Sequence, residues 1–388
     1  MSRITNPLIT NHLLVLSAIV AVAWFFSLTR TLLNLRVIHR LRATGPLARE
    51  PLVSVIIPAR DEERVIARTV LAFLAQSYAA LELIVVNDRS SDGTGAILRS
   101  IDDARLIVVD GEEPPSGWLG KPWALHEGSL RAHGELLLFV DADVIYAPEA
   151  VRAAVAHQQT GDAALLSLLP HFEMRGFWEN AVMPQLAIMV FSFLPLWLAN
   201  RSSAGVLAVG GGPGNLLSRE VYDAVGGHEA LRDSVIDDVA LSRLVRRKLH
   251  RRTEAVRADD FVSLRMYHGL GEIVDGFTKN MFFVLGRSYV FGILMIVAAF
   301  VFHLLPYLLA PLGDPFAIAT VVLITVTRLV LFASLRYSLL SAIFLHPVML
   351  MVWIYINLRS MWYTGVLRRL SWRGRTYDAR ESRFGAER

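Results

Sequence analysis

Apolar and polar residues follow three different patterns along this chain of 388 residues. An uncharged run covers residues 13–29, and near-continuous apolar stretches cover residues 289–312, 316–335 and 338–358. Between them, residues 50–285 alternate short apolar runs with polar segments. Apolar runs of about 20 residues are typical of membrane-spanning helices, and short runs are typical of a globular domain. The pattern therefore predicts a globular domain flanked by membrane segments.

The short runs within residues 50–285 have the composition of buried strands. They are rich in β-branched and aliphatic residues and lie at 53–58, 81–86, 105–109 and 135–140. Strands that are apolar on both faces are typical of a parallel sheet covered by helices. Residues 61–77 have apolar positions at helical spacing between the first two runs. This alternation predicts an α/β fold with a Rossmann-like, mostly parallel sheet flanked by helices.

The N-terminal segment, residues 1–45, is expected to anchor the chain in a membrane. Its uncharged run of 17 residues is just long enough to cross about 30 Å of hydrocarbon. Basic residues follow the run, and only Arg3 precedes it, which is the reverse of a cleaved signal peptide. Positive charge marks the cytoplasmic side of a span. We therefore expect a multi-pass protein of the cell's inner (plasma) membrane, with the domain at 50–285 in the cytoplasm.

Residues 286–360 are expected to form about three further spans, followed by a basic tail at 361–388. Arg328 lies inside the second stretch, where it is expected to snorkel toward the Arg336 end or to pair with a lipid phosphate. The stretch 181–199 is apolar but contains two prolines, so we expect it to lie at the membrane interface, with a membrane span as the alternative. One span before the domain and three after it would put the tail outside, whereas its arginines favour the cytoplasm. The sequence leaves this conflict open.

Composition removes several classes of site and partner. The chain has no cysteine, which excludes disulfides, a thiolate nucleophile and a zinc–thiolate centre. The net charge is only +4, and arginines border the apolar runs. The membrane bilayer, and no nucleic acid, is therefore the expected partner of the basic residues.

Acidic residues follow the predicted strands at the points where the strands end. The carboxyl ends of parallel strands form the ligand crevice of an open sheet, so these acids are expected to face one small volume. Any one of them could belong to an ordinary turn or helix cap. Two acids in the sequence VDAD repel each other unless a cation or polar ligand lies between them. A nucleoside diphosphate with a divalent metal satisfies the whole set, which consists of Asp61, Glu62, Asp88, Asp141 and Asp143.

Several motifs resemble one enzyme family. The segments SVIIPARDEE, ELIVVNDRSSDGT and LLLFVDAD look like the donor half of family 2 glycosyltransferases, which are inverting enzymes of the GT-A fold. The likeness continues through GWLGKPWALHEG, GGGPGNLLSREVYDAVGG, DDVALSRLV and RMYHGLGEIVDGFTKN, and it covers roughly residues 50–285. GWLGKPWAL together with RMY and GFTKN is similar to membrane-bound members that glycosylate lipids, including those associated with hopanoid and carotenoid pathways.

The resemblance implies a role for each residue of the donor site. The residues that would bind the nucleotide sugar are Pro58, Ala59, Asp61, Glu62, Asp88, Lys121 and Asp141. Asp141 would face the ribose or the sugar, and Lys121 would reach the nucleotide. Asp143 would bind the metal, Mg²⁺ or Mn²⁺, and the expected donor is a UDP-sugar.

The resemblance also implies a catalytic base and an acceptor region. The family usually has Glu-Asp where this chain has Asp237-Asp238, and the register with DVALSRL assigns Asp238 as the base, with Asp237 as the alternative. Two acids that open a helix can also be ordinary N-terminal charge placement. VGGGPGN (209–215) lacks the third glycine of a dinucleotide loop, so we expect a close-packed loop there. The residues expected near the acceptor or the diphosphate are Asn215, Arg265, Tyr267, Thr278 and Lys279.

These inferences predict transfer of a sugar, with inversion, from a nucleoside diphosphate donor to a membrane lipid. A processive polysaccharide synthase is an alternative, but the Gln-x-x-Arg-Trp motif usual in those enzymes is missing, and the corresponding region reads RMYHGLG. A non-catalytic lipid-binding protein on a transferase fold is a second alternative. It predicts the loss of at least one group of carboxylates, and all of them are present.

Overall fold

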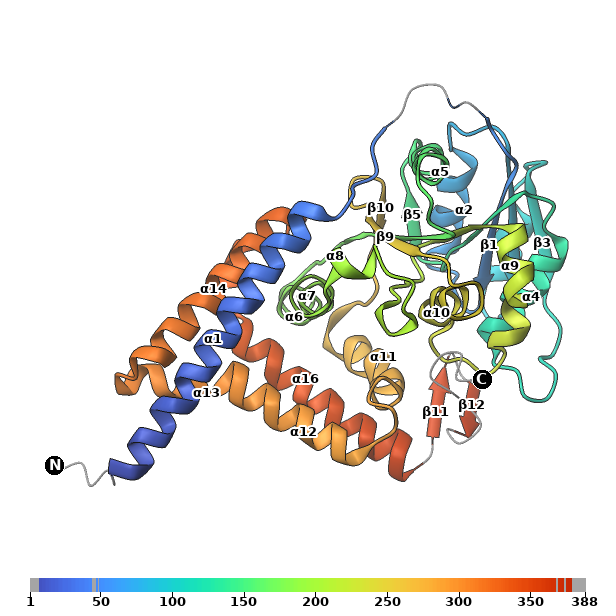
Figure 1. Cartoon of the computed structure of the whole chain (residues 1–388). Coiled ribbons are helices and arrows are strands. Elements are labelled where there is room, and N and C mark those ends of the chain that lie inside the picture. Colours follow the sequence, from blue (N-terminus) through green and yellow to red (C-terminus); the bar gives the residue numbers. More distant parts are fainter. Residues whose placement is uncertain (1–6, 44–46, 48, 368, 373–374, 379–388) are drawn as a thin grey trace. The chain divides into compact units, whose positions relative to one another are not determined.

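The computed structural model describes residues 7–43, 47, 49–367, 369–372 and 375–378, and the chain divides into two compact units. The first, which we call the sheet unit, contains Ile38–Glu173, Trp197–Met266 and Arg368–Arg388. The second, which we call the helical unit, contains Met1–Val37, Met174–Leu196 and Tyr267–Leu367. Figure 1 labels many of their helices and strands.

The larger sheet of the sheet unit has seven strands among the described residues, in the order β3-β2-β1-β4-β8-β6-β9. Strands β3, β2, β1 and β4 are parallel to one another, and β6 is parallel to β9, whereas β8 runs antiparallel to both of its neighbours. The strands are β1 (Val53–Ala59), β2 (Leu81–Asn87), β3 (Leu106–Asp110), β4 (Leu136–Phe139), β6 (Leu165–Leu169), β8 (Asn215–Ser218) and β9 (Thr253–Arg257). The predicted mostly parallel sheet is confirmed.

Both faces of this sheet are buried, as the continuous apolar runs predict. Successive side chains of a strand point to opposite faces, so Val55 and Ile57 join one hydrophobic cluster and Ile56 joins another. The first cluster includes residues of α2 (Ile66–Leu74) and α5 (Ala150–Thr160). The second includes residues of α4 (Gly120–Arg131), α9 (Arg219–Val225) and α10 (Asp237–Leu249). Helices therefore cover both faces, which is the layered arrangement of an α/β domain.

Smaller elements complete the sheet unit. A second sheet has the order β5-β10-β7, formed by Val144–Tyr146, Val262–Leu264 and His171–Phe172. Helix α3 is Thr94–Arg99, and β11 (Arg369–Trp372) pairs antiparallel with β12 (Arg375–Asp378). Residues 39–41 extend along β9, where Arg40 forms a parallel bridge with Arg257. The segment that follows the first helix of the chain therefore covers an edge strand of the larger sheet.

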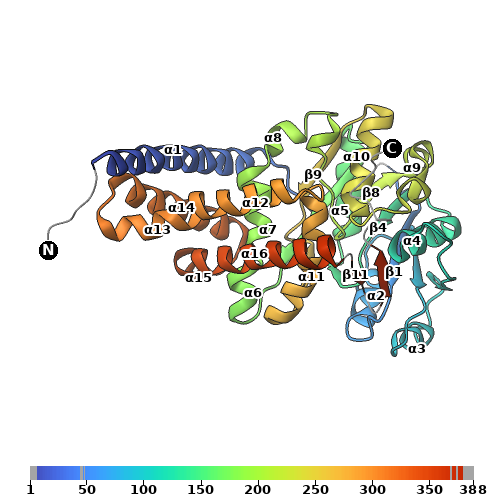
Figure 2. The ribbon, with the colours of Figure 1, turned by 90° about the horizontal axis from the view of Figure 1, so that it is seen from below.

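The helical unit contains long apolar helices. Among the described residues, three helices are long and apolar enough to cross a membrane, and they are Asn11–Val37, Tyr289–Leu312 and Pro315–Leu335. The first belongs to α1 (Pro7–Val37) and the third is α14 (Pro315–Leu335), and these two helices lie side by side in both views (Figures 1 and 2). The second combines α12 (Tyr289–Ala299), η4 (Phe300–Leu304), α13 (Leu305–Leu309) and η5 (Ala310–Leu312). One N-terminal and two C-terminal candidate spans result.

The third expected C-terminal span, residues 338–358, is divided in two. A single residue separates helix α15 (Leu339–Phe344) from helix α16 (His346–Ser360). Pro347, in the first turn of α16, has no backbone N–H to donate to the preceding turn, so the two helices do not join. Arg328 is 1% exposed and donates to the carbonyl oxygens of Ser341 (2.8 Å) and Ala342 (2.9 Å). The expectation that Arg328 snorkels or pairs with a lipid is therefore wrong, since its guanidinium satisfies carbonyls at this break.

The apolar stretch 181–199 forms short elements that are each too short to cross a membrane. They include α6 (Phe177–Val182), α7 (Pro184–Ile188) and the π-helix η1 (Met189–Phe193), and α8 is Leu196–Ala199. Asn34 of α1 donates to the carbonyl oxygens of Phe191 and Leu194 in the same unit. The helix α11 (Gly269–Val284) also belongs to the helical unit. A position at the membrane interface stays a prediction for this stretch.

Candidate active site

Three carboxylates of the sheet unit gather around one lysine. The ammonium of Lys121 lies 2.8 Å from Asp141 Oδ1 and 3.3 Å from Asp237 Oδ1. These side chains line a small pocket together with Asp238, Gly212, Asn215 and His228, over an apolar floor that includes Phe139 and Leu241. The sequence places Lys121 twenty residues before Asp141 and more than a hundred before Asp237, so only the fold brings these charges together.

Each charged side chain is positioned by the end of a helix or strand. Lys121 is the second residue of α4, and Asp141 follows β4 at the carboxyl edge of the sheet. Asp237 and Asp238 are the first two residues of α10, where the positive end of the helix dipole favours negative charge. Three separate elements therefore direct their ends into one volume.

A glycine loop between η2 (Gly205–Leu207) and β8 fits closely against these acids. Asp141 donates its backbone N–H to the carbonyl oxygen of Gly212 at 2.9 Å. A Cβ added to Gly212 would lie 1.8 Å from Asp141 Oδ2, and one added to Gly210 would lie 2.4 Å from the carbonyl oxygen of Asp238. Asn215 is 2% exposed and donates from Nδ2 to the Asp238 carbonyl oxygen at 3.4 Å. The predicted close-packed loop is confirmed, and it fixes the first turn of α10.

Burial and charge shift the pKa values of this cluster. Burial lowers the pKa of Lys121, but Asp141, Asp237 and Asp238 together raise it more, so it lies well above its usual range. Burial, with Asp238 and Asp141, raises the pKa of Asp237 from 3.8 to about 6, against the opposing effect of Lys121. The pKa of Asp238 is also raised, chiefly by burial, while Lys121 opposes the shift. Carboxyl groups with raised pKa values in a pocket are typical of functional sites.

The two adjacent aspartates differ in surroundings. Asp237 is 4% exposed, and its carboxylate contacts Lys121. Asp238 is less buried, and its Oδ1 accepts the N–H of Val239 at 2.7 Å. A catalytic base must reach its substrate, and the less buried Asp238 fits that role better than Asp237.

Other predicted donor-site residues follow the neighbouring strands. Asp61 has φ 52° after β1, and its Oδ1 accepts from the backbone N–H of Ser91 at 2.7 Å. The Glu62 N–H donates to Thr94 Oγ1 at 2.8 Å. Asp88 is 2% exposed, and its Oδ1 lies 3.7 Å from Arg89 Nε. These contacts join the loops after β1 and β2, and none of the three acids lines the pocket around Lys121.

The remaining predicted donor-site residues are placed as follows. Pro58 and Ala59 end β1, and the Ala59 carbonyl oxygen accepts the N–H of Asp88 at 2.8 Å. Asp143 is half-buried in the turn before β5 and does not line the pocket either. Strands β2, β1 and β4 are neighbours, so the acids that follow them share one edge of the sheet, as predicted.

The residues expected near the acceptor divide between the two units. Arg265 follows β10 in the sheet unit and is half-buried. Tyr267, Thr278 and Lys279 belong to the helical unit, where the ring of Tyr267 packs edge-on against Phe277 at 5.3 Å. Thr278 is buried, and its hydroxyl donates to the Val274 carbonyl oxygen at 2.6 Å. Tyr267 therefore packs against α11, and Thr278 hydrogen-bonds within it.

Among the residues that line the pocket, His228 and Gly212 make polar contacts but were not named individually by the sequence interpretation. His228 is 1% exposed, lies 2.9 Å from the Tyr222 hydroxyl through Nδ1, and has a pKa lowered to about 3 by burial. Gly212 meets Asp141 as described above. The sequence signal for Gly212 was the glycine run 210–212, whereas a lone histidine in GGHEA carries no signal.

Comparisons with known proteins agree with this architecture. The Glycosyl transferase family 2 model matches residues 54–226, which include β1 to β4 and β8, and ends before Asp237. A relative named 4,4'-diaponeurosporenoate glycosyltransferase, from Staphylococcus aureus strain MRSA252, is 31% identical over 252 residues, and the same protein from strain USA300 is 30% identical. The match covers 63% of this chain and 64% of the relative, so it spans less than two thirds of that protein.

Solved structures show the same fold. The mannosyltransferase PcManGT from Pyrobaculum calidifontis, solved in complex with GDP-Man and Mn²⁺, has a TM-score of 0.51 and covers 89% of this chain and 95% of its own. Its identity of 18% supports the fold, which is GT-A-like, and nothing finer. Residues 54–226 of the chain therefore match the family 2 glycosyltransferase model, in agreement with the resemblance seen in the sequence.

Proposed function

We propose that the chain transfers a sugar from a nucleoside diphosphate donor to an apolar acceptor held in the membrane, with inversion at the sugar. The observation that carries the proposal is the cluster of Asp141, Asp237 and Asp238 around Lys121. A family 2 domain supports the reaction class. The apolar helices of the helical unit support an acceptor that stays in the bilayer.

The residues of the pocket have different chemical roles. Asp238 acts as the general base that takes a proton from an acceptor hydroxyl, because it is the less buried of the two aspartates. Asp237 and Asp141 hold Lys121, whose charge faces the donor. Asp61, Glu62 and Asp88, with the backbone at Pro58 and Ala59, bind the base and ribose. The preferred donor is a UDP-sugar.

The residues present fit a divalent metal. Three carboxylates lie near one ammonium in the pocket, which leaves an excess of negative charge. Burial is the largest cause of the raised pKa of Asp237, and the charges of Asp238 and Asp141 add to it. Asp143 follows on the same strand end and offers the oxygen ligand that Mg²⁺ and Mn²⁺ prefer. A metal held by Asp143 would supply Lewis-acid stabilisation of the leaving diphosphate.

The topology of the proposed membrane protein follows from the number of spans. With one candidate span before the domain and two after it, the chain returns to the side of the membrane that holds the domain. The arginines around the first span favour the cytoplasm for that side. This arrangement removes the conflict over the basic tail, because the tail then also lies in the cytoplasm. The protein is thus a multi-pass protein of the plasma membrane.

The most specific acceptor that we propose is a carotenoid. The relative is named for diaponeurosporenoate, and the ending of that name denotes a carboxylate. A carboxylate acceptor is already ionised at neutral pH and needs no base, whereas a hydroxyl acceptor does. A comparison of transfer to the two acceptor types therefore distinguishes a loss of base catalysis from a loss of donor binding. Arg265, Tyr267, Thr278 and Lys279, with Asn215, are the residues that we propose near the acceptor or the diphosphate.

The experiment is a donor panel. Membranes that contain the protein are incubated with radiolabelled UDP- and GDP-sugars, and lipids are then extracted. The proposal expects label in the organic phase with at least one donor, and none with membranes that lack the protein. Label in a long water-soluble polymer, or nucleotide-sugar binding without any transfer, would overturn it.

A further inference from the structure

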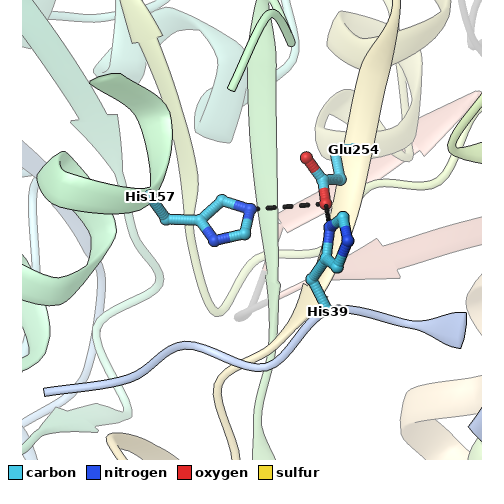
Figure 3. Close-up of side chains that lie close together, drawn as sticks. All are labelled: His39, His157 and Glu254. Carbon is cyan, nitrogen blue, oxygen red and sulfur yellow. Dashed lines mark hydrogen bonds and ion pairs between the residues drawn. The ribbon is translucent and has the colours of Figure 1, made fainter. Parts of the chain in front are cut away.

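A second cluster of possible metal ligands lies in the sheet unit, among residues to which the proposed reaction gives no role. His39, His157 and Glu254 come from three separate segments, and Figure 3 shows both rings directed at one oxygen of the glutamate. His39 lies just after α1 in the chain, His157 is in α5, and Glu254 is in β9. Among the described residues, no other group of three His, Cys, Asp or Glu side chains has its ligand atoms within 4.8 Å of one another.

The distances suit one small cation. His39 Nδ1 lies 2.6 Å from Glu254 Oε1, and His157 Nε2 lies 3.3 Å from the same oxygen. All three ligand atoms lie within 4.8 Å of one another. Two ligands at about 2.1 Å from a tetrahedral Zn²⁺ ion are about 3.4 Å apart. Only His39 must shift by more than a few tenths of an ångström, and its side chain is 69% exposed and can turn.

The chemistry of the ligands selects the metal. Two imidazoles and one carboxylate suit Zn²⁺ and related transition metals, whereas Mg²⁺ prefers oxygen ligands alone. Metal ligands must be deprotonated. Carboxylates and neutral imidazoles meet this condition at neutral pH. The exposed side of His39 leaves a path for the ion and room for water as a fourth ligand.

The backbone around His39 is already held in place for such a site. The Arg257 N–H donates to the His39 carbonyl oxygen at 2.9 Å, and the Leu41 N–H donates to the Arg257 carbonyl oxygen at 2.8 Å. His157 and Glu254 are 19% and 12% exposed, so they form a partly buried wall beside this segment. A ligand set held by backbone pairing loses little conformational freedom on binding.

We propose that His39, His157 and Glu254 form a binding site for a zinc-like divalent transition metal ion. The ion joins the segment that follows α1 to α5 and to the edge strand β9. It is a structural ion, separate from any metal of the sugar donor, and it stabilises the attachment of the juxtamembrane segment to the sheet unit.

The test is a zinc titration of the whole protein in detergent, after treatment with EDTA and with a purification tag that contains no histidine. Excess Mg²⁺ is present throughout, because it fills oxygen-only sites without competing for imidazole. Bound Zn²⁺ is counted by mass spectrometry of the metal, and Co²⁺ replaces it for an absorption spectrum that reports tetrahedral geometry. The variants are His157→Ala and His39→Ala, and the second removes a side chain that is 69% exposed.

His133→Ala is the matched control. His133 is 75% exposed and lies 3.2 Å from Glu82, but the described residues offer no third ligand there. We expect the wild type and the control variant to bind one Zn²⁺ with the same affinity, and both test variants to bind it at least about 100-fold more weakly. Even the outer contacts of metal ligands contribute about 10- to 100-fold to metal affinity. We also expect Zn²⁺ to raise the melting temperature of the wild type and the control alone. Absence of tight Zn²⁺ binding by the wild type, or Zn²⁺ binding by His157→Ala and His39→Ala as tight as that of the wild type, would overturn the proposal.

Discussion

Replacement of Gly212 by alanine tests the geometry of the pocket at a single atom. The added Cβ would lie 1.8 Å from Asp141 Oδ2 and 2.5 Å from Asp141 Cγ, and real Cβ atoms essentially never have contacts under 3.0 Å. The backbone cannot separate easily, because the Asp141 N–H donates to the Gly212 carbonyl oxygen at 2.9 Å. The carboxylate must therefore move by more than 1 Å and lose its 2.8 Å contact with Lys121.

A shift of this size has a calculable cost in rate. A displacement of about 1 Å in an active site can lower activity about 100-fold, which corresponds to about 2.7 kcal/mol of transition-state stabilisation. We therefore expect Gly212→Ala to lower kcat/KM for sugar transfer about 100-fold. The assay is the initial rate of label transfer from a nucleotide sugar to extractable lipid.

Gly211→Ala is the matched control for this substitution. A Cβ on Gly211 would meet only Pro213 Cδ within 4 Å, at 3.3 Å, so the same residue change one position earlier leaves Asp141 in place. Both variants should melt within a few degrees of the wild type, since the affected carboxylate is partly exposed. If the two folded variants have kcat/KM values within about twofold of each other, the reasoning on Asp141 is refuted.

Substitutions at three further positions test charge and packing. Lys121→Met should lower the free energy of unfolding at pH 8 by about 2 kcal/mol, which is less than the loss expected for a fully buried ion pair. Lys121→Arg should keep most of that stability in thermal melts. The pKa of Asp237 is raised from 3.8 to about 6, so the folded state holds this proton more tightly than the unfolded state. The resulting stabilisation, about 3 kcal/mol, is fully present below pH 4 and is lost as the pH rises through about 6. Asp237→Asn should therefore raise the melting temperature at pH 7 and leave it unchanged at pH 4, and equal effects at both pH values would contradict this sign. Arg328→Leu should destabilise the protein by about 2–4 kcal/mol in detergent melts, because the carbonyl oxygens of Ser341 and Ala342 lose their donor.

The sequence predicted the first half of the sheet well for a physical reason. Strands β1, β2 and β4 are buried on both faces, so their apolar runs stand out from the surrounding polar loops, and β3 is an apolar edge strand that is only half-buried. Strand β8 has four residues and runs antiparallel to both neighbours, and nothing in its short sequence shows that it lies between β4 and β6. Its place depends on contacts between distant segments, which periodicity does not reveal.

The membrane segments and the pocket show the same limit. Pro347 was visible as a helix breaker within 338–358, but the apolar composition of the stretch outweighed it in the prediction of a span. Asp237 and Asp238 were assigned through the family resemblance, and Lys121 was expected only to reach the nucleotide. The contacts of Lys121 with Asp141 and Asp237 join three elements, so they follow from the fold and not from spacing along the chain.

The most direct measurement of the central claim compares Asp238→Asn with the wild type in label transfer and in donor binding. Asp223, an exposed residue of α9, supplies the matched control as Asp223→Asn. With a hydroxyl acceptor, the account predicts that the wild type and Asp223→Asn transfer label, whereas Asp238→Asn binds the nucleotide sugar normally and transfers at least about 100-fold more slowly. Equal transfer by Asp238→Asn and the wild type, or no transfer by the wild type from any nucleotide sugar, would contradict the account.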